Sequence, residues 1–137
     1  FRPFAPVILE ERTSEYYQWD RESPYMLFVA TIRDDKREVP AVTHVDGSAR
    51  LQTVSRNQHP MFYDLIKEFE KQTGCPILIN TSFNVRGEPI VCTPEDAWKC
   101  FLRTEMDHLV MGSCLVSKSE LTGVDKKEIL AEAFEPD

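Results

Sequence analysis

The sequence lacks a long apolar run, and no segment of its 137 residues approaches membrane-spanning length. It also lacks a basic excess, because 16 Lys and Arg stand against 23 Asp and Glu, which gives a formal net charge of -7. An acidic chain is a poor partner for nucleic acid and for an anionic membrane surface. These two absences count against a membrane protein and against a domain that mainly binds nucleic acid.

Cysteine is scarce, and the four residues show no CxxC spacing. A zinc site needs closely spaced pairs, and a secreted disulfide scaffold is usually denser in cysteine. We therefore predict buried free thiols in a cytoplasmic protein. No histidine has a metal-ligand partner at useful spacing, so we expect no metal in this chain.

An apolar fraction of 42% in 137 residues is sufficient for one compact domain with a core. Strand and helix patterns interleave without a strict βαβ rhythm. This mixture predicts an α/β fold of the mixed α+β kind, a twisted mixed sheet with packed helices. We expect helices over 7–19, over 60–73 and from residue 94, and strands over 25–32, 41–54 and 109–116.

Two of these helices have clear local signals. Pro60 fits a first helical turn and Gly74 suits a C-terminal cap, while Thr93 and Pro94 suit an N-cap and the position after it. The helix over 60–73 carries an apolar stripe of Phe62, Leu65, Ile66 and Phe69.

The strands are predicted less sharply. The segment 25–32 is short and apolar, which indicates a strand buried on both faces. The segment 41–54 reads as a strand pair or one long bent strand around a turn at Asp46-Gly47, and Gly112 is expected to kink the strand over 109–116.

The segment Cys75–Pro89 is the most informative part of the chain. An apolar run breaks abruptly into small polar side chains, beginning at Asn80 and Ser82, and Arg86 adds a fixed cation. A polar loop at the end of a buried strand is a common place for a ligand in sheet proteins. These side chains suit an anion with several oxygen acceptors, such as a phosphate or a carboxylate.

Arginines also gather near the turn-bearing segments. If the strands that carry Arg50 and Asn80 are neighbours, these side chains can converge on one cavity, because guanidinium binds phosphate in a bidentate way. Asn80 and Ser82 are two apart, so on an extended chain they point to the same side. The set of arginines considered is Arg2, Arg50, Arg56 and Arg86.

Each of these residues has a plainer interpretation. Taken singly, Arg2 and Arg56 are more often solvated surface side chains, and Arg50 can instead pair with Asp46. Asn80 and Ser82 can simply satisfy backbone groups at a strand end. His44 is a candidate general base, although a lone histidine on a strand is more often structural. The residues alone indicate an anion-binding cavity and do not name a reaction.

Five blocks of sequence, taken in order, resemble a known family. They are Phe1–Pro6, Thr43–Val54, Asn80–Asn84, Gly87–Val91 and Thr93–Ala97. Together they resemble the C-terminal region of the O-carbamoyltransferases, which include nodulation and antibiotic-tailoring enzymes. The resemblance runs from Phe1 to about Lys118, so we predict a domain over 1–118 followed by an acidic tail or peripheral helix over 119–137.

The resemblance implies a fold and a reaction. In that family an N-terminal domain of the actin-like ATPase superfold, which holds a metal, is joined to a C-terminal domain of the YrdC type. The implied enzyme is a cytoplasmic carbamoyltransferase. Its YrdC-like domain binds carbamoyl phosphate and ATP, the latter as a substrate, and forms a carbamoyl-adenylate. The N-terminal domain, absent from this chain, passes the carbamoyl group to an acceptor hydroxyl, so we expect the chain to be inactive alone.

The resemblance also implies roles for particular residues. Arg50, Asn80 and Ser82 match positions that bind carbamoyl phosphate or the nucleotide phosphates, and Arg2 matches a further arginine of that pocket. Arg86 is added from its chemistry and not from the resemblance. Such a reaction depends on positioning and fixed positive charge, which agrees with a site that has no evident nucleophile.

Two other functions stay open on the sequence. One is a non-catalytic nucleotide-binding or phosphate-binding regulatory module, which would bind the same ligands without supporting transfer. The other is RNA binding, because YrdC-type folds have been likened to double-stranded RNA binders. The acidic balance and the absence of a basic stripe count against the second.

Overall fold

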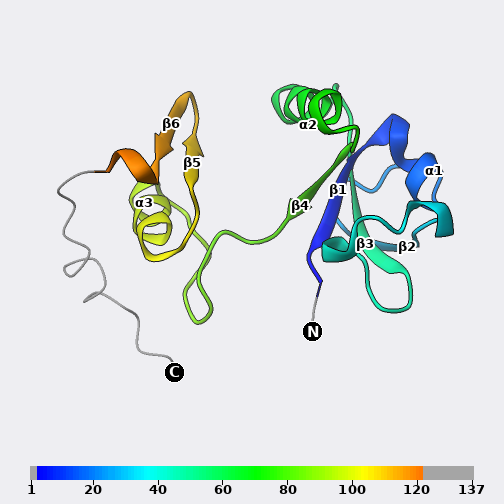
Figure 1. The fold of residues 1–137 in the computed structure, drawn as a ribbon, viewed down its shortest axis with the longest axis horizontal. Coiled ribbons are helices and arrows are strands. Elements are labelled where there is room, and N and C mark those ends of the chain that lie inside the picture. The colour runs from blue at the N-terminus through cyan, green and yellow to red at the C-terminus, as the bar shows by residue number, and fades with distance from the viewer. Residues whose placement is uncertain (1–2, 122–137) are drawn as a thin grey trace. The chain divides into compact units, whose positions relative to one another are not determined.

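A four-stranded mixed sheet forms the first of two compact units in the computed structural model, which describes residues 3–121 (Figure 1). The units are Phe1–Thr81 and Ser82–Asp137. The first contains β1 (Ala5–Leu9), α1 (Thr13–Tyr16), β2 (Phe28–Thr31), β3 (Ser48–Val54), α2 (Pro60–Thr73) and β4 (Ile77–Asn80). Its short 3-10 turns are Glu10–Arg12, Asp34–Lys36 and Pro40–Val42. The described part of the second contains α3 (Pro94–Arg103), β5 (His108–Met111), β6 (Cys114–Ser117) and a 3-10 turn at Lys118–Glu120.

The strand order of the sheet is β2-β3-β1-β4. β1 runs parallel to β3 and antiparallel to β4, and β2 pairs with β3 in the antiparallel sense. The prediction of a mixed sheet with packed helices is therefore confirmed. The central strand β1 joins two segments that are distant in sequence, because Val7 pairs with both Gln52 and Leu78, which lie 26 residues apart.

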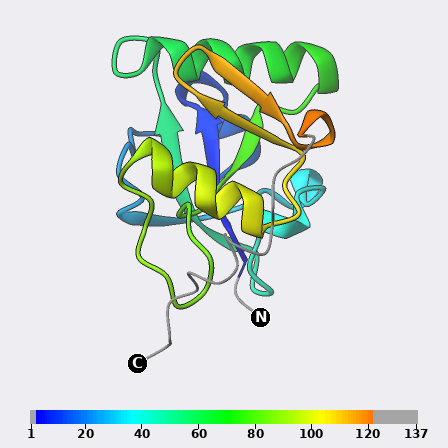
Figure 2. The same ribbon diagram turned by 90° about the vertical axis from the view of Figure 1, so that its left-hand side faces the viewer.

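The two faces of this sheet bury different cores. One face packs against the short helices and connections, in a cluster of Ile8, Tyr16, Tyr17, Ala30, Ile32, Val42, Ala49, Leu51 and Ile77. The other face packs against α2 through Val7, Leu9, Val54 and Ile66. Figure 2 shows α2 running across the strands near the end where β1 and β3 finish. Within the first unit, α2 covers only part of this second face.

The predicted helix over 7–19 is wrong at its start. Residues 5–9 form β1, and helical turns occupy only Glu10–Arg12 and Thr13–Tyr16. Val7, Ile8 and Leu9 are each fully buried. A run that is buried on both faces has no polar side, so it suits a central strand and not a surface helix.

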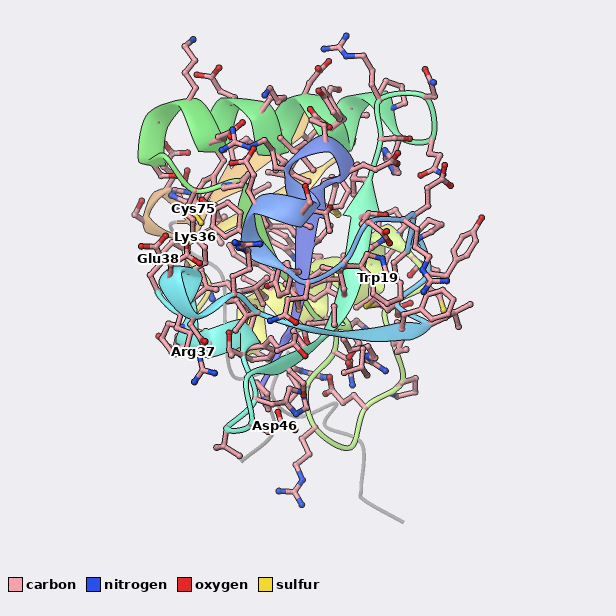
Figure 3. All side chains as sticks on the ribbon, turned by 90° about the vertical axis from the view of Figure 1, so that its right-hand side faces the viewer. Trp19, Lys36, Arg37, Glu38, Asp46 and Cys75 are labelled. Atoms are coloured by element: carbon pink, nitrogen blue, oxygen red, sulfur yellow. The ribbon has the colours of Figure 1, made fainter. Side chains whose placement is uncertain are left out.

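The predicted strand over 25–32 is shorter and more exposed than expected. β2 covers only Phe28–Thr31 and lies at the sheet edge, with Val29 63% exposed. The segment 41–54 contains a single strand, because the residues before the Asp46-Gly47 turn form the 3-10 turn Pro40–Val42. Gly47 adopts a φ of +81°, and Figure 3 shows Asp46 at the tip of this turn.

The helix over 60–73 is confirmed at both ends. Pro60 is its first residue and Gly74 follows it in the left-handed conformation, with a φ of +78°. Its predicted apolar stripe is only partly right, because Ile66 is buried whereas Leu65 is 57% exposed.

The second unit is built on α3 and a β-hairpin. Ala97, Phe101 and Leu102 of α3 pack against Leu109 of β5. The single strand expected over 109–116 is instead two strands, β5 and β6, and Gly112 lies in the turn between them with a φ of +58°. A turn with left-handed backbone reverses the chain where a kink was predicted.

The start of α3 is confirmed as a capping box. The Thr93 hydroxyl accepts a hydrogen bond from the Asp96 amide at 3.1 Å, and the Asp96 carboxylate accepts one from the Thr93 amide at 3.0 Å. Hydrogen bonds to the carboxylate from the Thr93 side chain, and then from the Thr93 and Cys92 amides, hold the pKa of Asp96 below its ordinary value. The two exchanged bonds satisfy amides that a helix start otherwise leaves unpaired.

A Thr93→Ala substitution should lower the unfolding free energy by about 1 kcal/mol at neutral pH. The carboxylate half of the box has a lowered pKa, so its contribution is complete above the ordinary Asp pKa and disappears as the pH falls through the lowered value. Urea unfolding between pH 7 and pH 3 measures both effects. Ser14→Ala is the control, since the exposed Ser14 hydroxyl makes no hydrogen bond to another described residue. An equal loss in both variants would contradict the assignment of the cap.

The cysteines are only partly as expected. All four are free, but Cys100 alone is buried, while Cys92 and Cys114 are exposed. Burial raises the pKa of the Cys100 thiol. Among the helices of residues 3–121, none has the length and apolar character to cross a membrane. The predicted tail from residue 119 lies almost wholly outside the described residues, which end at Leu121.

Candidate functional site

A row of polar side chains lies on the sheet face that α2 only partly covers. Ala5 pairs with Asn80, and Val7 pairs with Gln52. Because β1 and β3 are parallel, Ala5 lies level with Arg50, two residues before that pair. Paired residues in a sheet share a face, so Arg50, Gln52 and Asn80 project from the same face as Val7, which contacts α2.

Ala5 forms the floor of this row. It lies on the central strand, with Arg50 on one neighbouring strand and Asn80 on the other. These two neighbours of β1, the strands β3 and β4, are two strand spacings apart, about 10 Å. A methyl side chain between an arginine and an asparagine leaves room above the sheet for a small ligand.

A cavity of about 180 Å³ opens on the Arg50 side of this row. Its lining consists of Pro3, Phe4, Ala5, Val29, His44, Ser48 and Arg50. The polar groups are a guanidinium, an imidazole and a hydroxyl, and no carboxylate belongs to the lining. This arrangement favours an anion over a cation.

The Arg50 guanidinium is available to a ligand. Arg50 is exposed, and within residues 3–121 it makes no ion pair. The alternative of an Arg50–Asp46 pair is wrong, because Asp46 instead accepts a hydrogen bond from the Ser48 amide at 2.9 Å. Hydrogen bonds from the Ser48 side chain, and then from its amide, hold the pKa of Asp46 below its ordinary value. Asp46 is thus a turn residue, and the Arg50 guanidinium is not paired with it.

Asn80 is the second predicted residue that the sheet brings to this row. Its amide nitrogen donates to Gln52 Oε1 and lies 3.5 Å from Met26 Sδ. The plainer role of satisfying backbone groups at the strand end is not seen among the described residues, because both partners of the Asn80 amide are side chains. The condition that the strands of Arg50 and Asn80 are neighbours is not met, because β1 lies between β3 and β4, although all three strands belong to one sheet.

Arg56 does not join this site. It lies beyond the opposite end of β3, where it pairs with Asp64 and stacks over the ring of Tyr63 at 5.1 Å. The expected convergence of Arg56 with Arg50 is wrong, because six residues of nearly extended chain separate them by about 20 Å. Arg2 lies outside the described residues.

Ser82 and Arg86 belong to the second unit. Both are exposed and lie in the connection that precedes α3. Asn84 braces this connection, because its amide nitrogen donates to the carbonyls of Val85 at 3.1 Å and Glu88 at 3.0 Å. Roles for Ser82 and Arg86 in binding stay predictions.

A larger cavity of about 560 Å³ lies elsewhere in the first unit, and its chemistry is different. Its lining includes four acidic residues, Glu10, Glu11, Asp20 and Glu22. Burial, and then the neighbouring Glu22 and Glu11, raise the pKa of Glu10. Acidic side chains repel phosphate, so this cavity is not the predicted anion site despite its size. Within residues 3–121 no three His, Cys, Asp or Glu side chains lie together so as to hold a metal ion.

Sequence reasoning missed Ser48 and Gln52 as members of the row. Ser48, Arg50 and Gln52 alternate along β3, and this period of two was the available signal. This signal is weak, because Ser48 and Gln52 are uncharged. Ala5 gave no signal at all, because its importance comes from strand pairing alone.

Comparison with known proteins identifies a family and several relatives of this chain. The family "Carbamoyltransferase C-terminus" matches residues 1–118. An uncharacterised protein of Synechocystis is 45% identical over 158 aligned residues, which cover 100% of this chain and 26% of that protein. Nodulation protein NolNO of Sinorhizobium fredii is 51% identical over 122 residues, covering 86% of this chain and 18% of that protein. Nodulation protein NolO of Bradyrhizobium diazoefficiens is also 51% identical, with coverages of 86% and 22%.

The chain thus spans 18–26% of the length of these relatives. The match extends through both compact units and ends at Lys118. It includes every residue of the polar row and of the smaller cavity. The chain belongs to the carbamoyltransferase C-terminus family.

Proposed function

We propose that this chain supplies the carbamoyl phosphate site of an O-carbamoyltransferase. Water cleaves carbamoyl phosphate into carbamate and inorganic phosphate, and a carbamate oxygen then attacks the α-phosphorus of ATP, which releases pyrophosphate and gives a carbamoyl-adenylate. A hydroxyl of the acceptor attacks the carbamoyl carbon, loses its proton and releases AMP. An N-terminal domain outside this chain carries out that second step and holds the metal of the enzyme. The chain provides position and charge, and the reaction takes place in the cytoplasm, where four free thiols are stable.

One observation carries this proposal. The exposed guanidinium of Arg50, without a carboxylate partner among residues 3–121, lies level with Ala5 and lines a cavity together with His44 and Ser48. A guanidinium that faces an open cavity is a strong binder of phosphate oxygens. Family membership supplies the reaction to which this anion site belongs.

The size of the cavity indicates which substrate it holds. Pockets for larger organic ligands measure roughly 300–1,000 Å³. A volume of about 180 Å³ fits a small anion such as carbamoyl phosphate and is too small for a whole nucleotide. ATP therefore binds largely outside this cavity, and Ser82 and Arg86 are the proposed contacts for its phosphates.

An Arg50→Ala substitution should weaken carbamoyl phosphate binding by about 10-fold to 150-fold, since a hydrogen bond to a charged group contributes about 1.5–3 kcal/mol. Thermal unfolding titrated with carbamoyl phosphate, ATP and inorganic phosphate measures this effect. Arg56→Ala is the matched control, because Arg56 has the same charge but is paired with Asp64 at the far end of β3. Equal weakening by both substitutions would show that net charge, and not this site, causes binding.

A longer polypeptide that carries the N-terminal domain tests the role of the site in transfer. Its anion binding is measured by the same titration, and its activity is measured as carbamoylation of the acceptor. Arg50→Ala should then abolish most carbamoylation of the acceptor. Binding that is lost while carbamoylation continues at the wild-type rate would favour a regulatory phosphate-binding module. If no anion stabilises either the chain or the longer polypeptide, the proposed function is wrong.

A further inference from the structure

A chain of amide hydrogen bonds crosses the polar row and begins at a backbone carbonyl. Gln52 Nε2 donates to the carbonyl oxygen of Pro24 at 3.0 Å. Gln52 Oε1 in turn accepts a hydrogen bond from Asn80 Nδ2. The same nitrogen of Asn80 lies 3.5 Å from Met26 Sδ.

The two ends of this chain determine how both amides are turned. A backbone carbonyl and a thioether can only accept hydrogen bonds. Since Pro24 accepts, Gln52 must direct its NH₂ group toward Pro24 and its oxygen toward Asn80. Asn80 must therefore direct its NH₂ group toward Gln52 and Met26, and the oxygen and nitrogen of each amide are assigned by their partners.

Met26 supports the view that this arrangement is built for a purpose. It is the one non-glycine residue in the described part of the chain with a positive φ, at +54°. A side chain larger than glycine rarely adopts this backbone conformation, because it costs energy. Strain of this kind is often retained where it places a group at a ligand site. Here the strained residue is Met26, whose sulfur accepts a hydrogen bond from the Asn80 amide nitrogen.

The orientation leaves Asn80 Oδ1 as the group that faces a ligand. Within residues 3–121 this oxygen has no hydrogen-bond partner, and it is not among the buried unpaired atoms, so it reaches solvent. An amide oxygen accepts a hydrogen bond from N–H or O–H and repels a phosphate oxygen. The row thus offers a cation at Arg50 and a pure acceptor at Asn80, with Ala5 between them.

We propose that Gln52 is a positioning residue that fixes Asn80 as the receptor of the carbamoyl NH₂ group. Arg50 binds the phosphate of carbamoyl phosphate, and Asn80 Oδ1 accepts from its amino group. This assignment rests on the proposed function and refines it, because Asn80 then binds the amino group of the donor and not its phosphate. Gln52 contacts no substrate atom and acts only through Asn80.

Acetyl phosphate is the probe that isolates this contact. It carries a methyl group where carbamoyl phosphate carries NH₂, and the two have nearly the same shape and charge. The ratio of their dissociation constants therefore reports the Asn80 contact and cancels the phosphate contribution. One hydrogen bond to a partly exposed oxygen predicts that the wild-type protein prefers carbamoyl phosphate by about tenfold.

Two substitutions at Gln52 separate positioning from simple packing. Gln52→Leu removes both hydrogen bonds and supplies no new acceptor, so only the weak Met26 contact still orients the Asn80 amide, and the preference should fall below about threefold. Gln52→Glu keeps an oxygen acceptor for Asn80 Nδ2, so it should preserve the preference of about tenfold although its charge weakens both ligands. Asn80→Ala is a further variant that should abolish the preference. Unfolding curves first establish that each variant is folded.

Calorimetric titration of the longer polypeptide with carbamoyl phosphate, acetyl phosphate and inorganic phosphate distinguishes the outcomes. If none of the three anions binds the wild-type protein, the proposed function fails. If all three bind but the wild type shows no preference for carbamoyl phosphate, the anion site stands and the role of Gln52 and Asn80 is overturned. A preference that survives in folded Gln52→Leu, or disappears in folded Gln52→Glu, overturns the positioning role of Gln52.

Discussion

An Ile66→Ala variant should lose about 2–5 kcal/mol of unfolding free energy, because it removes a fully buried aliphatic side chain and leaves a cavity. Ile66 is the one buried residue among the fourteen of α2. It packs with Val7, Leu9 and Val54, where α2 covers the sheet. The loss of these contacts should weaken the packing of α2 on the sheet face that also carries the polar row.

Leu65→Ala is the matched control for this prediction. Leu65 is the preceding residue of the same helix, but it is 57% exposed, and alanine is at least as good a helix former as leucine. Its substitution should change the unfolding free energy by less than about 0.5 kcal/mol. Urea unfolding followed by circular dichroism compares the two variants. Similar losses would mean that the outer side of α2 is covered in solution by something beyond the described residues.

The helices α2 and α3 could be predicted because the signals at their ends are local. Pro60 and Gly74 mark the ends of α2, and Thr93 with Pro94 marks the start of α3, at positions where particular residues satisfy free backbone groups or tolerate special backbone angles. Such signals depend on neighbours a few residues away. They do not depend on how the chain folds over longer distances.

The strand β1 could not be predicted in the same way. Apolar residues before a charged, weakly periodic segment fit a helix as well as they fit a strand. The choice is made by partners at positions 52–54 and 77–80, which give Val7 and Ile8 a neighbouring strand on both sides. Burial of this central strand decides its structure, and pattern alone does not contain that information.

The same distinction separates the parts of the candidate site. Arg50 and Asn80 attracted notice as polar residues beside apolar runs, and both belong to the row. The position of Ala5 between them depends on the register of two strand pairs, and the orientation of the Asn80 amide depends on a carbonyl at Pro24. Features that arise from register and from second partners become visible only in three dimensions.

A Lys118→Met variant should lose about 1–3 kcal/mol of unfolding free energy in the second unit, because the Thr104 carbonyl loses its donor and the Phe101 carbonyl keeps only its bonds from Thr104. Lys118 Nζ donates to the carbonyl of Phe101 at 2.7 Å and to that of Thr104, both at the C-terminal end of α3. The ammonium also lies 4.5 Å from the centre of the Phe101 ring. Methionine keeps the apolar stem over this ring, so the substitution isolates the charge and its hydrogen bonds.

Lys71→Met is the control for Lys118→Met. Lys71 also lies in the last turn of a helix, but its side chain is 77% exposed and 3.4 Å from Glu68, a pairing that contributes less than about 1 kcal/mol. Denaturation of both variants in a Trp19→Phe background, followed by the fluorescence of Trp98 on α3, compares their effects. Equal stability of Lys118→Met and the wild-type protein would contradict the role of the ammonium as a helix cap. A large loss would give a physical reason for the family match to extend to residue 118, since a chain cut before Lys118 would leave the carbonyls at the end of α3 without this donor.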